Sequence, residues 1–329
     1  MTPHNITETM KLLKQLYEIY SPSGGEKHLK KFIKYYINEH MPEARIEHDQ
    51  AGNIYITKGT AESFPCVVAH LDQVQKNHSK DFRAVETKEI IFGYSSKNKR
   101  QEGLGADDKN GIWIALRCLE KYDSIKLAFF VQEETGCIGS SKANMSFFSD
   151  CRFVLQCDRR GGNDLITNAS WSELCSDEFL QAMDFGSFGY RPENGMLTDV
   201  ATLKDNGLAV SCLNLSCGYY EPHTDHEFTI KAELQNCLAL VCHIIETCTN
   251  VYPHTDDGYG CYGSYGYNGG YYGYGYEEYD MACDMVDDYL SYNPHATVQE
   301  VYDLFKEDFI HLDKDDFADI VRSCNKRCL

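Results

Sequence analysis

The fold of this chain is decided by the segment Phe129-Phe130-Val131-Gln132-Glu133-Glu134-Thr135-Gly136-Cys137-Ile138-Gly139-Ser140. The residues that lead into it, 125–131, are apolar except for Lys126, which predicts a central strand covered on both faces. Gly136 and Gly139 allow the chain to leave that strand sharply and to begin a helix. Two adjacent carboxylates at the mouth of a sheet repel each other, and a metal ion relieves this when one glutamate binds it and the other acts as an acid or base beside it. An isolated Glu-Glu pair could also be a solvated acidic turn. The choice between this turn and a metal site therefore depends on the rest of the chain.

Length and charge limit the possible functions. With 329 residues, the chain can bury a full hydrophobic core and has room for one large and one small domain. A hydrophobic content of 43% and a charged content of 25% are ordinary for a globular protein in water. The net charge of -19 argues against nucleic acid or an anionic membrane as the main partner, and it is compatible with a site that concentrates divalent cations.

The cysteines and the N-terminal residues bear on location. None of the 15 cysteines forms a Cys-x-x-Cys pair, and most stand among apolar residues, as Cys66 and Cys242 do. This is typical of reduced thiols that pack as small hydrophobic side chains. Residues 1–16 contain no uninterrupted apolar core, so no signal peptide is expected, and no apolar run reaches the length that spans a membrane. These features together predict a cytoplasmic protein.

Helical and strand patterns alternate along the chain. Apolar residues at helical spacing predict helices near residues 5–17, 29–37, 112–119, 139–148, 198–206 and 229–249. Short apolar runs predict strands near residues 45–47, 54–56, 65–69, 125–131, 152–157 and 209–215, and residues 82–93 resemble a surface hairpin. This alternation predicts a doubly wound α/β fold with three α/β/α layers.

Composition divides the chain into three parts. We expect a packed domain over residues 1–250, a Tyr/Gly-rich linker over 251–276 and a small helical tail over 277–329. Residues 258–276 hold eight tyrosines and eight glycines among nineteen positions, a composition that cannot build a core. In the tail, residues 297–300 (Thr-Val-Gln-Glu) have the pattern of a capping box that begins a helix. Because the tail is acidic, a DNA-binding module is not expected there, and its protein partner stays open.

Polar side chains recur where successive predicted strands end, the edge at which open α/β sheets bind ligands. They are His70, Asp72, Asp107, Glu133, Glu134, Asp158 and His223. Histidine and carboxylate ligands without a thiolate suit a hydrolytic divalent metal, Zn2+ most readily, with Mn2+ or Co2+ as alternatives. The number of candidate ligands exceeds the need of one ion and fits a centre of two metals about 3.5–4 Å apart.

Each candidate also has a purely structural interpretation. His70 could be a core histidine with Asp72 as its solvated neighbour. Asp107 and Asp108 could cap the helix that follows them, and Asp158 could belong to an ordinary turn. Their joint occurrence at successive strand ends favours the metal site.

Taken together, these motifs resemble those of the co-catalytic zinc exopeptidase superfamily, which contains aminopeptidases, peptidase-T-like tripeptidases and related acylases. The matching segments are residues 21–26, 49–53, 70–72, 105–111, 133–140 and 223–227. They cover roughly residues 17–245 and follow one another in the family's order. In the last segment His226 and Asp225 compete with His223 for a role, and the family pattern favours His223.

Carried over by position, the resemblance implies a ligand set for two divalent metal ions. Asp107 would bridge the two ions. His70 and Asp158 would complete one site, and Glu134 and His223 would complete the other.

The resemblance also implies the remaining roles. Asp72 would hold the His70 ring through its second nitrogen. Glu133 would act as the general base, taking a proton from the attacking water and handing it to the leaving amine. Members of the family commonly hold the peptide bond after the bridging aspartate in the cis form, here the bond between Asp107 and Asp108.

Two segments are shorter than in many members of that superfamily. The segments from His70 to Asp107 and from Asp158 to His223 are too short for the lid or dimerisation domain that is often inserted there. We therefore expect a bare, lidless catalytic domain over residues 1–250. Aromatic candidates for the wall of a substrate pocket, each also suited to the core, are Trp171, Phe185, Phe188, Tyr190, Tyr219 and Tyr220.

The leading hypothesis is a metal-dependent aminopeptidase or small-peptide exopeptidase. An amidase or N-deacylase of the same mechanism, acting on N-acyl amino acids, is the nearer alternative, because the motifs do not separate the two. A non-catalytic scaffold that binds partners through the C-terminal tract is a third hypothesis. The presence of Glu133 together with all five candidate ligands argues against the scaffold.

Overall fold

A computed structural model describes residues 3–169 and 172–255 and, in the C-terminal part, residues 282, 285–286, 289–290, 293, 295–306, 309 and 312–327. The chain forms two compact units, Met1–Gly260 and Cys261–Leu329. Most of the expected Tyr/Gly-rich linker, from residue 256 onward, lies outside the described residues, and so does Trp171. The division of the chain at residues 250 and 276 stays a prediction.

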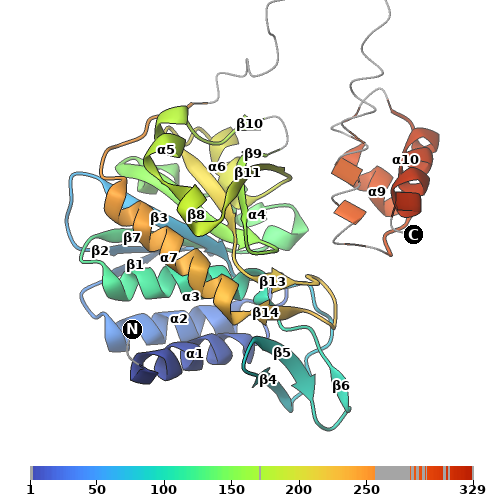
Figure 1. Ribbon diagram of the computed structural model, residues 1–329, viewed down its shortest axis with the longest axis horizontal. Helices are drawn as coiled ribbons and strands as arrows, with labels where there is room; N and C mark the ends of the chain where they lie inside the picture. Colours follow the sequence, from blue (N-terminus) through green and yellow to red (C-terminus); the bar gives the residue numbers. More distant parts are fainter. Residues whose placement is uncertain are drawn as a thin grey trace, which may run out of the picture. The chain divides into compact units, whose positions relative to one another are not determined.

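A large mixed sheet organises the first unit (Figure 1). Its strands follow the order β1-β2-β7-β3-β8-β12-β9-β10, with β11 beside β9. Their bounds are β1 Arg45–His48, β2 Ile54–Lys58, β3 Phe64–His70, β7 Ile125–Phe130, β8 Cys151–Arg159, β9 Asp164–Ala169, β10 Ser172–Glu173, β11 Arg191–Gly195 and β12 Cys212–Ser216. Strands β7, β3, β8 and β12 run parallel to one another, so their carboxyl ends meet at one edge.

Helices cover both faces of this sheet, as expected for three layers. Their bounds are α1 Pro3–Tyr17, α2 Lys27–His40, α3 Ala106–Lys121, α4 Ile138–Ser141, α5 Asp177–Ala182, α6 Asp199–Asp205 and α7 Lys231–Thr247. Alternate residues of one strand belong to different cores. Val67 lies in a first core with side chains of α1, α2, α3 and α7, and Val68 lies in a second core with side chains of α6 and Phe147. This confirms the predicted doubly wound α/β fold.

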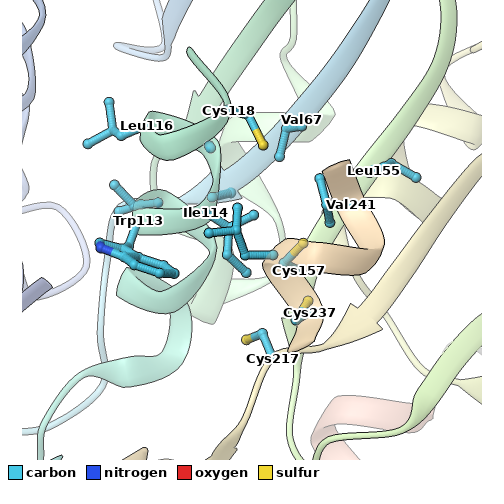
Figure 2. Close-up of a cluster of buried hydrophobic side chains, with 14 of the residues drawn as sticks. Val67, Trp113, Ile114, Leu116, Cys118, Leu155, Cys157, Cys217, Cys237 and Val241 are labelled. Atoms are coloured by element: carbon cyan, nitrogen blue, oxygen red, sulfur yellow. The ribbon is translucent and has the colours of Figure 1, made fainter. Parts of the chain in front are cut away.

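The first core contains a group of buried thiols (Figure 2). Cys118 on α3 and Cys237 on α7 are fully buried, as is Cys157 on β8. Trp113 of α3 is the largest fully buried side chain in this part of the chain. The cysteines here fill space between helix and sheet as small apolar side chains.

A second, small sheet joins segments that are far apart in the sequence. The expected hairpin at residues 82–93 is present as β4 Phe82–Glu86 and β5 Ile90–Ser95. Strand β5 also pairs with β14 Phe228–Ile230, which in turn pairs with β13 Tyr219–Tyr220, and β6 Arg100–Gln101 lies at the other end of β5. The loop between β13 and β14 is thereby held next to the segment that enters α3.

The helix predicted at residues 139–148 is present but is shorter than predicted. Helix α4 ends at Ser141, and a short 3-10 turn follows at Met145–Phe148. The backbone N–H of Asn144 donates to the Tyr55 hydroxyl at 2.9 Å instead of to a carbonyl of the preceding helical turn. A tertiary contact thus takes the place of the hydrogen bond that a longer helix would form at Asn144.

The strand predicted at residues 209–215 begins later, at Cys212. The residues before it pair with the end of the first unit, since Val210 forms a bridge with Pro253. The packed part of this unit therefore continues a few residues beyond position 250. Among the described residues, no helix is both long and apolar enough to cross a bilayer.

In the second unit, α9 spans Val298–Phe305 and α10 spans Lys314–Arg327. The predicted capping box is present, because the Thr297 hydroxyl accepts from the backbone N–H of Glu300 and the Glu300 carboxylate accepts from that of Thr297. Val301, Phe305 and Phe317 are buried within this unit.

Candidate metal centre

The carboxyl edge of the large sheet gathers three of the predicted segments. His70 is the last residue of β3, and Glu133 and Glu134 follow β7 in a 3-10 turn. Asp158 is the next-to-last residue of β8. Because β7, β3 and β8 are adjacent and parallel, these side chains converge at one place without any long connection.

Asp107 and His223 reach the same place from loops. Asp107 lies at the start of α3, behind Gly105, which has a left-handed φ of 65°. The positive φ favours glycine at this position, and a β-carbon here would also come within 2.8 Å of Lys109 Nζ. His223 lies between β13 and β14, with a left-handed φ of 64°. The small sheet thus brings the last candidate ligand across to the sheet edge.

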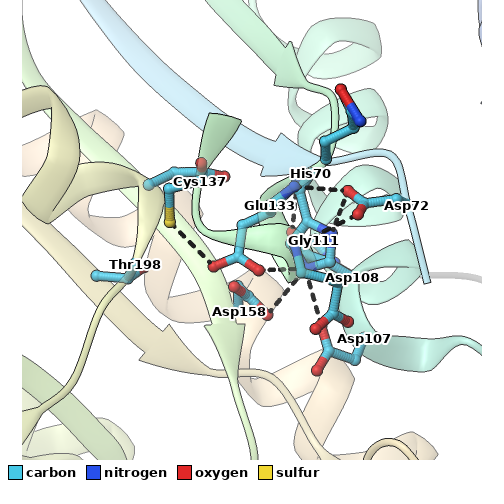
Figure 3. Close-up of polar contacts among 12 residues, drawn as sticks. His70, Asp72, Asp107, Asp108, Gly111, Glu133, Cys137, Asp158 and Thr198 are labelled. Carbon is cyan, nitrogen blue, oxygen red and sulfur yellow. Dashed lines mark hydrogen bonds and ion pairs between the residues drawn. The ribbon is translucent and has the colours of Figure 1, made fainter. Parts of the chain in front are cut away.

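The Asp107 carboxylate lies between two histidines, and Figure 3 shows its contact with one of them, His70. Its Oδ1 lies 2.9 Å from His70 Nε2, and its Oδ2 lies 3.2 Å from His223 Nε2. On one side, His70 Nε2 is also 3.7 Å from Asp158 Oδ1. On the other side, His223 Nε2 is 3.1 Å from Glu134 Oε2. The two oxygens of one carboxylate therefore face two separate histidine–carboxylate pairs.

The charges in this cluster are poorly balanced by the protein alone. Burial, followed by the charge of Asp107, raises the pKa of Asp158 to about 8. Burial also raises the pKa of Glu134, whose Oε1 is buried without a hydrogen-bond partner. Contacts with His223 and His70 lower the pKa of Asp107 in spite of its burial, which acts in the opposite direction. Divalent cations would relieve this crowding of buried carboxylates, so the donor set fits metal ions.

Donor atoms that could share one ion occur in two groups among the described residues. They are His70, Asp107 and Glu134, and His70, Asp108 and Asp158. Asp108 is fully buried, and its oxygens accept from the backbone N–H groups of His70 at 3.1 Å and Gly111 at 3.0 Å. We therefore assign Asp108 to fixing the backbone. The peptide bond between Asp107 and Asp108 is cis, as the resemblance implied.

Asp72 connects the His70 ring with the Glu133–Glu134 turn. Its Oδ1 lies 3.5 Å from His70 Nδ1, the ring nitrogen that faces away from Asp107. Its carboxylate also accepts from the backbone N–H groups of Glu133 at 2.9 Å and Glu134 at 3.3 Å, and from the hydroxyl of Ser23 at 2.7 Å. One carboxylate thus orients a histidine and two glutamates at once.

Three supporting residues had no assigned role in the sequence analysis. Glu227 is fully buried and accepts from the backbone N–H groups of Gly105 and Asp107, so it holds the loop that carries Asp107. Asn53 accepts from the backbone N–H of Val131 at 3.1 Å, just before the Glu133–Glu134 turn. Both lie in motifs quoted above, but their partners are distant in sequence. The third is Cys137, described below.

Of the described aromatic candidates, Tyr219 contacts the centre, with its hydroxyl donating to Asp158 Oδ1 at 3.2 Å. Tyr190 is buried and donates to the Ser216 carbonyl, and Tyr220 donates to Glu233. Phe185 and Phe188 are half-buried against the first core.

The rival residues of the last motif point elsewhere. His226 is exposed, and its Nδ1 is 3.0 Å from Gln101 Oε1. Asp225 accepts from the exposed amide of Asn77. Of these three rivals, only His223 has its ring beside the Asp107 carboxylate among the described residues.

Solved structures with the same fold are aminopeptidases and a tripeptidase. Aminopeptidase PepT of Bacillus cereus matches with a TM-score of 0.57 and 15% identity over 73% of this chain and 97% of that chain. A tripeptidase of Staphylococcus aureus matches with a TM-score of 0.58 and 14% identity over 72% and 97%. Aminopeptidase APDkam598 of the archaeon Desulfurococcus kamchatkensis matches with a TM-score of 0.58 and 16% identity over 73% and 95%.

Sequence comparison gives a shorter match. A Pyrobaculum aerophilum protein named LysW-lysine/LysW-ornithine hydrolase is 38% identical over 63 residues, which are 19% of this chain and 18% of that protein. The chain thus matches less than a fifth of that relative's length. No family model matches the chain. The structural likeness confirms the resemblance at the level of the fold: this chain has the fold of peptidase-T-like aminopeptidases.

Proposed function

We propose that this chain is a metal-dependent hydrolase of peptide bonds, an aminopeptidase or small-peptide exopeptidase. One observation carries the proposal: the two oxygens of Asp107 face two different histidines, each with a further carboxylate beside it. That arrangement suits a carboxylate that bridges two cations.

In the proposed centre, His70, Asp107 and Asp158 hold one divalent ion, and Asp107, Glu134 and His223 hold the second. Zn2+ suits these ligands best, with Mn2+ or Co2+ as alternatives. Bound ions of this kind supply an activated water and an electrophile for the scissile carbonyl.

The protein's own residues transfer the proton of the attacking water and hold the metal ligands in position. Glu133 lies at the edge of the cluster, with Oε2 4.0 Å from His70 Nε2, and is the proposed general base. It accepts the proton of the attacking water and delivers it to the leaving amine. Asp72 fixes the tautomer and the orientation of His70 through the Nδ1 side of the ring.

An N-deacylase or amidase is the second candidate function. The short match to the Pyrobaculum protein supports it, since that protein is named as a hydrolase of LysW-linked lysine and ornithine. The names of the structural neighbours support the peptidase instead. Both candidates use the same residues.

Metal analysis combined with a substrate panel tests the proposal. The purified full chain is analysed by mass spectrometry for bound metal and assayed on aminoacyl peptides and on N-acyl amino acids. We expect about two divalent ions per chain and hydrolysis that stops on chelation and returns with added metal. A chain that binds no metal, or that binds metal and cleaves neither class of substrate, contradicts the proposal.

A further inference from the structure

The two oxygens of Glu133 have different surroundings (Figure 3). Oε2 faces the cluster, 4.0 Å from His70 Nε2. Oε1 points the other way and accepts a hydrogen bond from the Cys137 thiol, with 3.5 Å between oxygen and sulfur. The carboxylate is therefore anchored on the side that faces away from the ligands.

The backbone of the turn places Cys137 at this position. The N–H of Cys137 donates to the carbonyl of Glu133 at 2.7 Å, which closes the turn. Gly136 and Cys137 both have left-handed backbone conformations, with φ of 96° and 52°. Residues other than glycine and asparagine rarely adopt this backbone conformation. The surrounding structure therefore holds Cys137 in a conformation that cysteine does not prefer. Cys137 is 1% exposed.

The Cys137 thiol is suited to donating a hydrogen bond. Burial raises the pKa of Cys137, and the negative charges of Glu133 and Asp199 raise it further. A thiol in these surroundings keeps its proton at neutral pH, and a carboxylate is the strongest acceptor that it could meet.

We propose that Cys137 is a positioning residue for Glu133. The Cys137 thiol holds Oε1 of Glu133, so that Oε2 stays directed at the metal ligands. The inference rests on the proposed function, in which Glu133 is the general base. A general base needs its accepting oxygen within reach of the attacking water, and rotation of the carboxylate would move that oxygen away. Cys137 restricts this rotation and is not itself one of the proposed ligands.

Kinetics of Cys137 variants give the first test. We expect Cys137→Ala to lower kcat about tenfold, with KM and bound metal unchanged, because one hydrogen bond to the base is lost. Cys137→Ser keeps a donor and should recover part of this loss. The matched control is Cys212→Ala, another fully buried thiol, which donates to the carbonyl of Val200 at 3.6 Å in the second core. An unchanged kcat in Cys137→Ala overturns the inference, and so does an equal loss of kcat in Cys137→Ala and Cys212→Ala.

A double variant tests the route of the effect. In a Glu133→Gln background, Cys137→Ala should cause no further loss of kcat, because the group that it positions no longer acts as a base. A full additional tenfold loss would show that Cys137 acts by another route and would overturn the inference.

Infrared spectroscopy of the metal-loaded chain gives a readout that does not depend on activity. The difference between wild type and Cys137→Ser isolates the S–H stretch of this thiol, and Glu133→Gln should move that band to higher frequency, because a neutral amide is the weaker acceptor. A band that does not move overturns the contact. If wild type cleaves no substrate while the band does move, the proposed function fails and the Cys137–Glu133 contact stands.

Discussion

The side-chain amide of Asn53 donates a hydrogen bond to the backbone carbonyl of Gly139 over 2.9 Å. Its Oδ1 accepts from Val131, so one buried side chain joins the residues on either side of the Glu133–Glu134 turn. We predict that Asn53→Ala lowers the free energy of unfolding by about 1–3 kcal/mol, because the buried N–H of Val131 loses its acceptor and the Gly139 carbonyl keeps only the N–H of Lys142. Urea unfolding measures this.

The control for that variant is Asn98→Ala. Asn98 is exposed, and its amide donates to the hydroxyl of Ser79 at 2.6 Å, where water can replace it. We expect a change within about 0.5 kcal/mol. Equal stabilities of the Asn53 and Asn98 variants would show that Asn53 does not hold the turn.

Glu133 and Glu134 are adjacent, but we predict different effects of their substitution. Glu133→Gln should lower turnover by about 10²–10⁴, because it removes a proton acceptor and preserves shape. Bound metal should stay at the wild-type level. Glu134→Gln should instead lose metal, because it changes a proposed ligand. Mass spectrometry of both variants measures the bound metal. Loss of metal from Glu133→Gln would show that Glu133 is the ligand and that Glu134 is the base.

Removal of metal should destabilise the folded chain. Without cations, Asp107, Glu134 and Asp158 are crowded together in a buried site. Free metal at about 100 times Kd stabilises a folded protein by about 2.7 kcal/mol, so a chelator should lower the melting temperature and added Zn2+ should restore it. Calorimetry with and without metal measures the difference.

Two histidine variants provide the comparison for that experiment. His223→Ala should reduce the gain in melting temperature on metal addition, because a proposed ligand is missing. His226→Ala should keep the full gain, since His226 is exposed and contacts Gln101. Equal gains in the two variants would contradict the assignment of His223.

His78 makes stability depend on pH. Its ring stacks between Tyr20 and Phe82, at centroid distances of 5.1 and 4.3 Å. Burial, followed by the charge of Lys109, lowers the pKa of His78 from 6.5 to about 4. The unfolded chain therefore binds more protons than the folded chain between these two values, and His78 makes the folded state less stable as the pH falls through that interval.

A phenylalanine at position 78 would keep the stacking and remove the titration. We predict that His78→Phe loses less unfolding free energy than wild type between about pH 6.5 and pH 4. Urea unfolding of the metal-free chains at several pH values tests this. His40→Phe is the control, because His40 is exposed and also stacks on an aromatic ring, that of Tyr36, at 4.2 Å. Parallel pH profiles for wild type and His78→Phe would refute the prediction.

The sheet and its edge could be predicted because their signals are local. An apolar run followed by Glu133-Glu134 and glycines indicates a strand and a turn, and His70 and Asp158 each stand at the end of such a run. Parallel neighbours then bring the strand ends together, whatever the detail of the packing.

The supporting contacts could not be predicted, because each joins segments that are distant in sequence. Asn53 meets Gly139, and Glu227 meets the backbone of Asp107. The pairing of β5 with β14, which carries His223 to the site, has no local signal either. The left-handed conformation of Cys137 opposes the preference of its side chain, so propensity would have placed the thiol elsewhere.

The last part of the first unit shows where the chain can be shortened. The backbone N–H of Tyr252 donates to the Arg152 carbonyl at 3.0 Å, and that of His254 donates to the Ala209 carbonyl at 3.0 Å. The Tyr252 ring is buried in the first core. Residues up to His254 therefore belong to the packed part of the first unit.

We predict that a chain ending after Thr255 folds, binds metal and hydrolyses substrate at the wild-type rate, because every proposed ligand and every contact described for the first unit is retained. A chain ending after Thr249 lacks Tyr252 and its hydrogen bonds, and it should lose about 3–5 kcal/mol of stability, as for removal of a buried aromatic side chain. Circular dichroism, metal analysis and peptide assays compare the two chains. If the chain ending after Thr255 folds and binds metal but does not turn over substrate, residues beyond it contribute to catalysis, and the proposed division between catalytic domain and tail is wrong.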